Sequence, residues 1–256
     1  MSSLERWIAS SAQKFGLQIS RISSQNARFP VEATANDVQL INSLKPFTMT
    51  SNERLWSLLN AVRHVVDTRV AGDLVECGVW RGGSIMAMAS ELKSLGSTDR
   101  RIWLYDTFAG MTAPTTEDVE EGTGVTADSM LKSTPVADGD NVWCVAGLAD
   151  VQANVRSTGY PFEQFTFIEG DVGKTLLQTA PEKISLLRLD TDWYESTKME
   201  LEVLYPRLSI GGVCIFDDYG HWQGARRAVD EYFEKLGYRP YMHPIDYSGR
   251  VLIKTV

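Results

Sequence analysis

Short apolar runs alternate with longer amphipathic segments from Asp73 onward, and this alternation limits the possible folds more than any other feature of the sequence. Continuous apolar runs are typical of strands that are buried on both faces. Strands separated by helices predict an α/β fold, in which a mostly parallel sheet lies between two layers of helices. The runs that predict strands are residues 74–77, 102–105, 165–169, 184–189 and 212–216.

Amphipathic segments before and between these runs predict the helices. The first follows a capping residue, Thr50 or Ser51, and its apolar side chains share one face. The last ends at Gly237, because glycine is a common helix stop signal. The expected helices are residues 53–65, 84–95, 196–208 and 222–236.

The two ends of the chain differ in pattern. Residues 238–243 and 250–254 flank a turn sequence and predict a β-hairpin, which would add an antiparallel strand to the sheet edge. Residues 4–15 predict a short amphipathic helix, whereas residues 20–46 are weakly patterned and are expected to be irregular.

This organisation predicts one domain with two additions. Residues 1–48 are expected to be an N-terminal extension, and residues 49–256 the domain itself. Residues 109–139 are rich in Thr, Glu, Asp and Gly and have few large apolar side chains. Because such a segment cannot bury much apolar surface, we expect a mobile lid loop over the site.

Charge and composition restrict the partners. A formal net charge of −8 argues against nucleic acid, because phosphate binding needs clustered Lys and Arg. No apolar run reaches the roughly 18 residues of a membrane span, and no signal peptide is visible at the start. Cys77, Cys144 and Cys214 show no CxxC spacing and are expected to be reduced. We therefore expect a cytoplasmic protein without a membrane partner; homo-oligomerisation stays open.

The first candidate site segment, VECGVWRGGS at Val75–Ser84, joins a strand to a helix. In parallel sheets this is where ligands bind, and glycines such as Gly78 allow a ligand to approach the backbone. The spacing differs from the GxGxxG pyrophosphate motif. Glu76 would repel a pyrophosphate but suits a cofactor that carries an amino group and a sulfonium. The alternative is a tight turn without a ligand.

Two further acids follow predicted strands. Asp106 can accept hydrogen bonds from a ribose diol, or it can cap the following turn. Asp171 can face an adenine, or it can be a helix N-cap. Together with Glu76, these acids favour an adenosine cofactor without a phosphate tail.

The densest cluster of acids is Asp190, Asp192, Asp217 and Asp218, which follow two successive apolar runs. All four are expected at the sheet edge that holds the cofactor motifs. Carboxylate oxygens are ligands for Mg²⁺, Mn²⁺ or Ca²⁺, and a bound dication would offset their mutual repulsion. The alternative is a set of separate caps and surface acids.

Other polar residues have plainer interpretations. His221 follows the second acid pair and is either a site residue or a cap. Arg226 and Arg227 are expected on a solvated helix face. Asp192 lies two residues after Asp190, so an extended backbone would point both side chains to one face.

The runs VECGVWRGGS, LYDTF, LLRLDTDWYEST and LYPRLSIGGVCIFDDYG resemble the macrocin O-methyltransferase family over roughly residues 47–256. The resemblance implies a class I methyltransferase, Rossmann-like fold with a seven-stranded sheet. It also implies S-adenosylmethionine as methyl donor and a Mg²⁺ ion, or Mn²⁺, that orients two hydroxyls of the acceptor. The N-terminal residues, the loop at 109–139 and His221 are not part of the family pattern.

The resemblance also assigns roles to residues. Asp190, Asp217 and Asp218 match the metal ligands, and Asp192 matches the general base, for which His221 is the competing candidate. Glu76 and Asp106 match cofactor contacts, and Met49 and Thr50 resemble a segment that closes over the cofactor. Gly78, Ser84 and Thr107 lie in or beside the same motifs, and Asp171 is a cofactor candidate because it follows a predicted strand.

The function expected from the residues and the resemblance is methylation of a hydroxyl in a vicinal diol. The acceptor would be a sugar or a sugar-bearing small molecule. Three alternatives are a nicotinamide-dependent oxidoreductase, methylation of a non-sugar hydroxyl, and a non-catalytic cofactor-binding scaffold. The glycine spacing and Glu76 disfavour the first, and the complete set of aspartates disfavours the last.

Overall fold

The computed structural model describes residues 29–136 and 142–256 and is built around one sheet with the strand order β3-β2-β1-β4-β5-β7-β6. All neighbours from β3 to β5 are parallel, whereas β7 is antiparallel to both β5 and β6. This confirms the expected seven-stranded, mostly parallel sheet with an antiparallel hairpin. The strands are β1 (Asp73–Cys77), β2 (Ile102–Asp106), β3 (Phe165–Glu169), β4 (Ile184–Leu189), β5 (Leu208–Phe216), β6 (His243–Pro244) and β7 (Arg250–Ile253).

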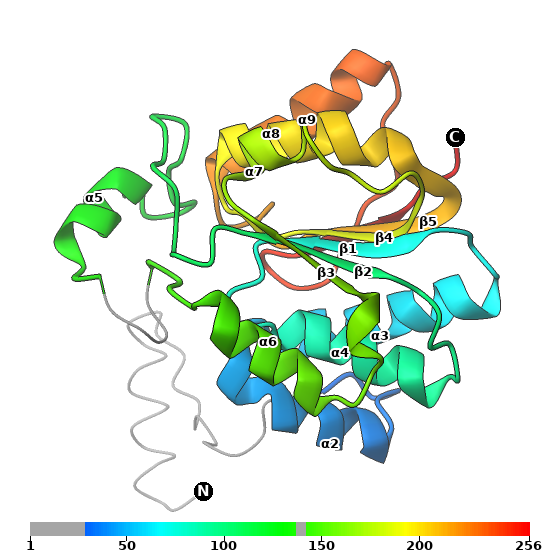
Figure 1. Cartoon of the computed structure of the whole chain (residues 1–256). Helices are drawn as coiled ribbons and strands as arrows, with labels where there is room; N and C mark the ends of the chain where they lie inside the picture. Colours follow the sequence, from blue (N-terminus) through cyan, green and yellow to red (C-terminus); the bar gives the residue numbers. More distant parts are fainter. Residues whose placement is uncertain (1–28, 137–141) are drawn as a thin grey trace, which may run out of the picture.

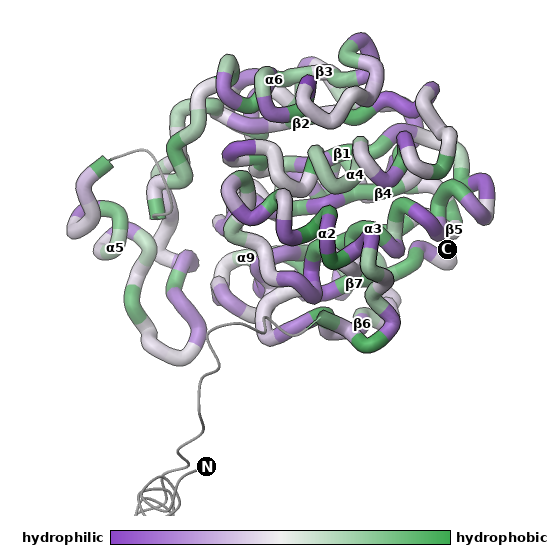
Figure 2. The backbone as a smooth tube through the Cα atoms, turned by 90° about the horizontal axis from the view of Figure 1, so that it is seen from below, coloured by the Kyte–Doolittle hydropathy of each residue, from purple (hydrophilic) through white to green (hydrophobic). Residues whose placement is uncertain are grey.

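Helices cover both faces of the sheet (Figure 1). Figure 2 shows the strands in the same order, with β3 and β6 at opposite edges. One layer contains α2 (Ala35–Leu44), α3 (Asn52–Asp67), α4 (Gly83–Ser94) and α6 (Leu148–Ser157). The other contains α7 (Val172–Thr175), α8 (Tyr194–Leu204) and α9 (Gln223–Leu236).

Alternate strand residues fill two cores. Leu74 and Leu186 belong to the cluster under α3 and α4, whereas Val75 and Leu187 belong to the cluster under α8 and α9. Because successive side chains point to opposite faces, strands that are apolar at most positions bury both faces of the sheet. No helix in the described ranges is long and apolar enough to cross a membrane.

One helix was not expected. Residues 35–44 lie in the stretch interpreted as irregular, but they form α2, so that interpretation is wrong there. A capping box explains its start: the Thr34 side chain accepts from the Asp37 N–H, and the Asp37 carboxylate accepts from the Thr34 N–H. Ile41 and Leu44 are buried and anchor the helix in the core. The expected helix at 4–15 lies outside the described residues.

Prolines explain two boundary errors. The helix expected at 196–208 ends at Leu204, a short 3₁₀ turn with Pro206 follows, and β5 begins at Leu208 rather than 212. The strand expected at 238–243 is reduced to β6, because Pro240 and Pro244 cannot donate ladder hydrogen bonds.

The expected lid segment contains some regular structure. It includes α5 (Ala127–Ser133), which stands apart from the sheet, and a bridge between Val119 and Thr126. Leu131 of α5 packs in a small apolar cluster with Trp193 and Trp222. Its mobility stays a prediction.

Candidate active site

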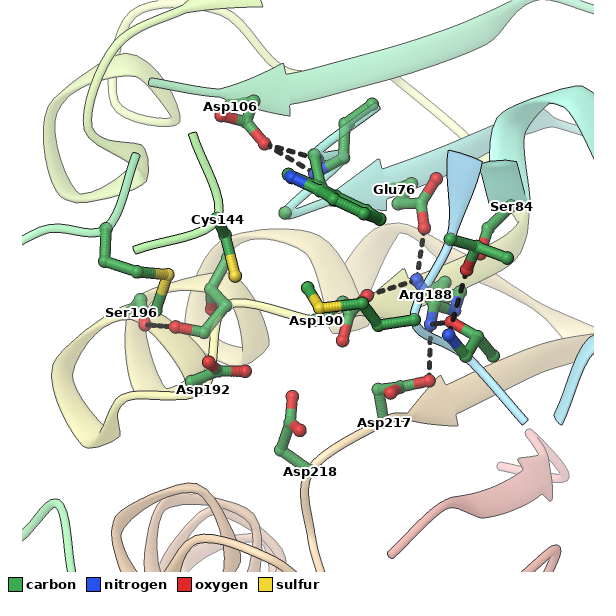
Figure 3. Close-up of a pocket in the computed structure, with 18 of the residues that line it drawn as sticks. Glu76, Ser84, Asp106, Cys144, Arg188, Asp190, Asp192, Ser196, Asp217 and Asp218 are labelled. Atoms are coloured by element: carbon green, nitrogen blue, oxygen red, sulfur yellow. Dashed lines mark hydrogen bonds and ion pairs between the residues drawn. The ribbon is translucent and has the colours of Figure 1, made fainter. Parts of the chain in front are cut away.

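A cavity of about 400 Å³ opens at the carboxyl ends of β1, β2, β4 and β5 (Figure 3). The chain reverses its strand order between β1 and β4, and such a switch point is the usual ligand site of an open parallel sheet. Every predicted site residue except Asp171 lines the cavity: Met49, Thr50, Glu76, Gly78, Ser84, Asp106, Thr107, Asp190, Asp192, Asp217, Asp218 and His221.

Glu76 of β1 lines the cavity. Its side chain is 1% exposed, and one carboxylate oxygen, Oε1, accepts from Arg188. The other oxygen, Oε2, is buried and has no hydrogen-bond partner among residues 29–136 and 142–256. Burial raises the pKa of Glu76 to about 7, although the charge of Arg188 opposes the shift. An unpartnered buried carboxylate oxygen that lines a cavity fits a ligand with a cationic amine.

Gly78 is required by the backbone around it. Its φ is +80°, and a Cβ at this position would lie 1.9 Å from the carbonyl oxygen of Asp190. From the sequence, this glycine was expected to allow a ligand to approach the backbone. The structure gives it a second task, because it allows the loop after β1 to cross the loop after β4.

Asp106 and Asp171 both act as caps. The Asp106 carboxylate accepts from the backbone N–H groups of Val79 (2.6 Å), Trp80 (3.0 Å) and Phe108 (2.7 Å), so it holds the glycine turn in place. Asp171 caps α7 by accepting from Gly173, and it does not line the cavity. The ribose role of Asp106 stays a prediction, and the cap alternative describes Asp171 better than a contact with adenine.

Arg188 connects the two halves of the site, as Figure 3 shows. Its guanidinium donates to Glu76, to Asp217, to Asp190 (2.6 Å) and to the Thr50 hydroxyl (3.1 Å). Burial acts to lower the pKa of Arg188, but the surrounding carboxylates raise it well above its usual value. This residue therefore ties three strand ends and the Thr50 segment together.

Arg54 of α3 also pairs with one of the carboxylates that Arg188 binds. It pairs with Asp217, and its Nε lies 3.0 Å from an Asp246 oxygen in the turn before β7. Burial acts to raise the pKa of Asp217, but the charges of Arg188 and Arg54 outweigh burial and lower it. Both carboxylate oxygens of Asp217 are thus held by arginines.

The other three aspartates face one another. Asp190, Asp192 and Asp218 each present an oxygen, and these oxygens lie within 4.8 Å of one another. Oδ2 of Asp218 is buried and has no hydrogen-bond partner within the part of the chain that the structure describes. Burial raises the pKa of Asp192 to about 7; a hydrogen bond with Asp218 opposes this shift, and the charge of Asp190 adds to it. Burial and the charges of neighbouring carboxylates raise the pKa of Asp218 well above its usual value. Three converging hard oxygen donors fit a divalent cation such as Mg²⁺ or Mn²⁺.

The expected reason for this convergence is wrong. Asp192 has a φ of +65°, in the left-handed region, so the backbone is not extended past β4. The turn, rather than a strand periodicity of two, brings Asp192 toward Asp190 and Asp218. A non-glycine residue in this conformation is strained and persists only where its surroundings hold it.

His221 lines the same cavity. Its Nδ1 lies 3.4 Å from the Tyr247 hydroxyl, and its Nε2 lies 3.7 Å from a Glu120 oxygen. Burial lowers the pKa of His221, with Glu120 acting against the shift. The imidazole therefore lies in the site, at the side of the carboxylate cluster.

The cavity lining includes residues for which the sequence predicted no site role, among them Arg54, Arg188, Trp222 and Tyr247. Arg188 did leave a signal, because it is a single charge within an otherwise apolar strand, and a buried charge needs partners. Arg226 and Arg227 are on the surface as expected, and they pair with Glu121 and Glu117.

Similarity to known proteins extends over most of the chain. The macrocin-O-methyltransferase (TylF) family matches residues 12–254. The chain is 36% identical over 202 residues to the 8-demethyl-8-(2,3-dimethoxy-alpha-L-rhamnosyl)-tetracenomycin-C 4′-O-methyltransferase of Streptomyces olivaceus, covering 79% of this chain and 73% of that relative. It is also 36% identical over 203 residues to the demethyldecarbamoylnovobiocin O-methyltransferase of Streptomyces niveus, with the same two coverages of 79% and 73%.

A solved structure is similar as well. The O-methyltransferase NovP superposes with a TM-score of 0.71 at 33% identity, covering 82% of this chain and 83% of that one. Similarity in sequence and in fold thus includes the elements that carry the cavity.

Proposed function

This chain belongs to the macrocin-O-methyltransferase family and is an S-adenosylmethionine-dependent O-methyltransferase. We propose that it methylates a sugar hydroxyl of a glycosylated natural product and that the reaction requires a divalent metal ion. The observation that carries the proposal is one cavity with two unpartnered carboxylate oxygens, Glu76 Oε2 and Asp218 Oδ2. The first suits a cationic amine, and the second suits a metal ion.

The glycosylated acceptor is proposed from the relatives. The Streptomyces olivaceus enzyme is named for a rhamnosyl-bearing tetracenomycin and the Streptomyces niveus enzyme for a novobiocin precursor. The aromatic side chains of Trp222 and Tyr247 line the cavity beside the carboxylates, and such side chains offer apolar faces next to polar groups. A non-sugar hydroxyl is the alternative acceptor.

The ion would be held by Asp190 and Asp218, which belong both to the cluster in the structure and to the set implied by family resemblance. Asp217 is the third ligand implied by the resemblance, although two arginines hold its oxygens. When bound, the ion would supply Lewis acidity that makes an acceptor hydroxyl easier to deprotonate. Asp192 accepts the proton as general base, while Glu76 orients the methyl donor through its amino group.

A methyl-transfer assay tests the proposal. Exhaustive chelation should abolish transfer to a glycosylated acceptor that carries a vicinal diol, and Mg²⁺ or Mn²⁺ should restore it. Removing one hydroxyl of the diol should reduce transfer to the other by about 10²-fold or more, because the two oxygens position each other. Full activity after chelation would exclude the ion, and equal activity on the sugar-free acceptor would exclude the sugar.

A direct measurement of ion binding distinguishes the aspartates that are metal ligands from those that are not. Titration with Mn²⁺, followed by electron paramagnetic resonance, should show weaker binding for Asp218→Asn. If Asp217→Asn loses affinity for Mn²⁺ equally, Asp217 is a ligand; if its loss of affinity is small, Asp217 is not a ligand.

A further inference from the structure

The helix that follows the Asp190–Asp192 turn begins without a cap of its own. Trp193 is the N-cap residue of α8, and its side chain makes no capping hydrogen bond. The first N–H groups of a helix have no partner within the helix and need an acceptor. Asp118, which is 76 positions earlier in the chain, supplies one: its Oδ1 accepts from the Tyr194 N–H at 2.7 Å.

Asp118 is a fully buried acid, with an exposed fraction of 0%. Its Oδ2 accepts from the N–H and the hydroxyl of Thr115, at 2.6 and 3.0 Å. No Lys or Arg of the described ranges forms an ion pair with it. The N-terminus of α8 therefore stabilises the negative charge of the Asp118 carboxylate, through a direct hydrogen bond and through the helix dipole.

The N-terminal turn of α9 is shaped around the same carboxylate. A Cβ on Gly224 would lie 2.2 Å from Oδ1 of Asp118 and 3.2 Å from Cβ of Tyr194. Only glycine leaves room for the acid at this place, since the distance to Oδ1 is far below any normal contact. The carboxylate is thus enclosed between the first turns of α8 and α9.

Other contacts bind the same loop to the turn that carries Asp192. The Trp193 indole donates to the Thr112 carbonyl at 3.1 Å, and Trp193 packs edge-on against Trp222. Glu120 forms a bridge with Trp222, and the Ala127 N–H donates to the Asp118 carbonyl at 2.8 Å. The segment at 112–127 is therefore attached to Trp193 and Tyr194, which directly follow the turn, and to Trp222, which packs against Trp193.

We propose that Asp118 is a positioning residue for methyl transfer, because its cap on α8 holds the turn in which Asp192 adopts its left-handed conformation. A residue in a strained conformation such as Asp192 keeps it only because surrounding contacts hold the backbone in place. Asp118 provides such a contact at the first residue of α8. The inference rests on the proposed role of Asp192 in catalysis.

Replacing the acid tests the cap. In Asp118→Ala we expect kcat to fall about 10- to 100-fold, as small displacements of a catalytic group do, with S-adenosylmethionine affinity within about twofold of wild type. Asp118→Asn keeps one carbonyl oxygen for Tyr194 and should recover most of the loss. Glu117→Gln, which removes only a surface ion pair of the same loop, is the matched control and should keep wild-type turnover.

Gly224→Ala displaces the carboxylate without removing it and should reproduce the Asp118→Ala phenotype. Its matched control is Gly147→Ala, because a Cβ on Gly147 meets nothing within 4 Å and its φ is −74°. If Asp118→Ala and Gly224→Ala reduce kcat alike, the loss of kcat follows from the contact between Asp118 and the start of α8. Circular dichroism would verify that each variant is folded.

Hydrogen exchange gives a readout that does not depend on turnover. Peptides covering residues 190–197 should exchange faster in Asp118→Ala and Gly224→Ala, and at the wild-type rate in both controls. Folded variants with unchanged exchange and unchanged kcat would overturn the proposal. A fall in cofactor affinity as large as the fall in kcat would also overturn it, since the effect would then be general loosening. If wild type transfers no methyl group, the proposed function fails, while the exchange result still decides whether Asp118 caps the turn.

Discussion

At the scale of single residues, the acids of the site depend on two arginines, Arg54 and Arg188, which pair with Asp217 from two directions. Acids that end apolar strands converge at one sheet edge, so Asp190 and Asp218 could be predicted together. Arg188 is part of a strand and has no spacing signature. Its role depends on which strands become neighbours, because its partners come from β1 and β5. The turn at Asp192 was also missed, since its geometry depends on tertiary contacts.

The base assignment is a prediction at this scale. Asp192→Asn keeps the shape of the side chain but removes the proton acceptor, so we expect kcat to fall by ~10²–10⁴, the usual range for general base catalysis. Cofactor affinity, measured by calorimetry, should not change. His221→Asn is the comparison, because His221 lies beside the same cavity but outside the carboxylate cluster, and it should mainly raise KM for the acceptor. A near-normal Asp192→Asn enzyme with an inactive His221→Asn enzyme would make the imidazole the base.

At the scale of elements, long periodic segments were predicted well and short capped ones were not. The spacing of Leu55, Leu58 and Val62 was enough to predict α3. In α2 the apolar stripe is short, and its clearest signal is the Thr34–Asp37 capping box, in which Asp replaces the usual Glu. The hairpin was predicted at the correct place, but its first strand was predicted too long because the two prolines were not weighed.

The capping box gives the prediction at this scale. Thr34→Ala should lower the free energy of unfolding by about 1 kcal/mol, which is typical for loss of an N-cap. Ser43→Ala is the matched control, because Ser43 is an exposed residue of α2 that bonds only to the Leu40 carbonyl. Urea unfolding of both variants checks this, and equal midpoints would show that the box does not stabilise α2.

At the scale of the whole molecule, the sheet order explains why motifs distant in sequence share one cavity. The cofactor motifs follow β1 and β2, the aspartates follow β4 and β5, and β1 and β4 are neighbours. Alternating strands and helices could predict a parallel sheet with its ligands at one edge. The position of β4 beside β1, rather than beyond β3, has no local signal in the sequence.

Stability against pH is the prediction at this scale. Glu200 of α8 is fully buried, and burial raises its pKa from 4.5 to about 8. Between these values the folded chain keeps a proton that the unfolded chain has lost, so this group makes stability fall as pH rises from about 4.5 to 8. Glu200→Gln removes that slope. Its stability relative to wild type, from urea unfolding, should therefore increase between pH 5 and pH 8.

The matched control for this prediction is Glu202→Gln. Glu202 is on the same helix, but its side chain is exposed. Its stability relative to wild type should stay constant across the pH range. A constant difference for Glu200→Gln as well would mean that Glu200 is ionised in the folded chain.

The enclosure of Asp118 between α8 and α9 sets the boundaries of any chimera. Exchanging residues 109–139 between relatives would test whether this segment determines the choice of acceptor. A donor loop with a larger side chain at position 118 would meet the first turn of α9, and a recipient with alanine at position 224 would leave no room for the acid. The transferable module therefore consists of the loop together with Trp222 and Gly224, two positions about a hundred residues further along the chain.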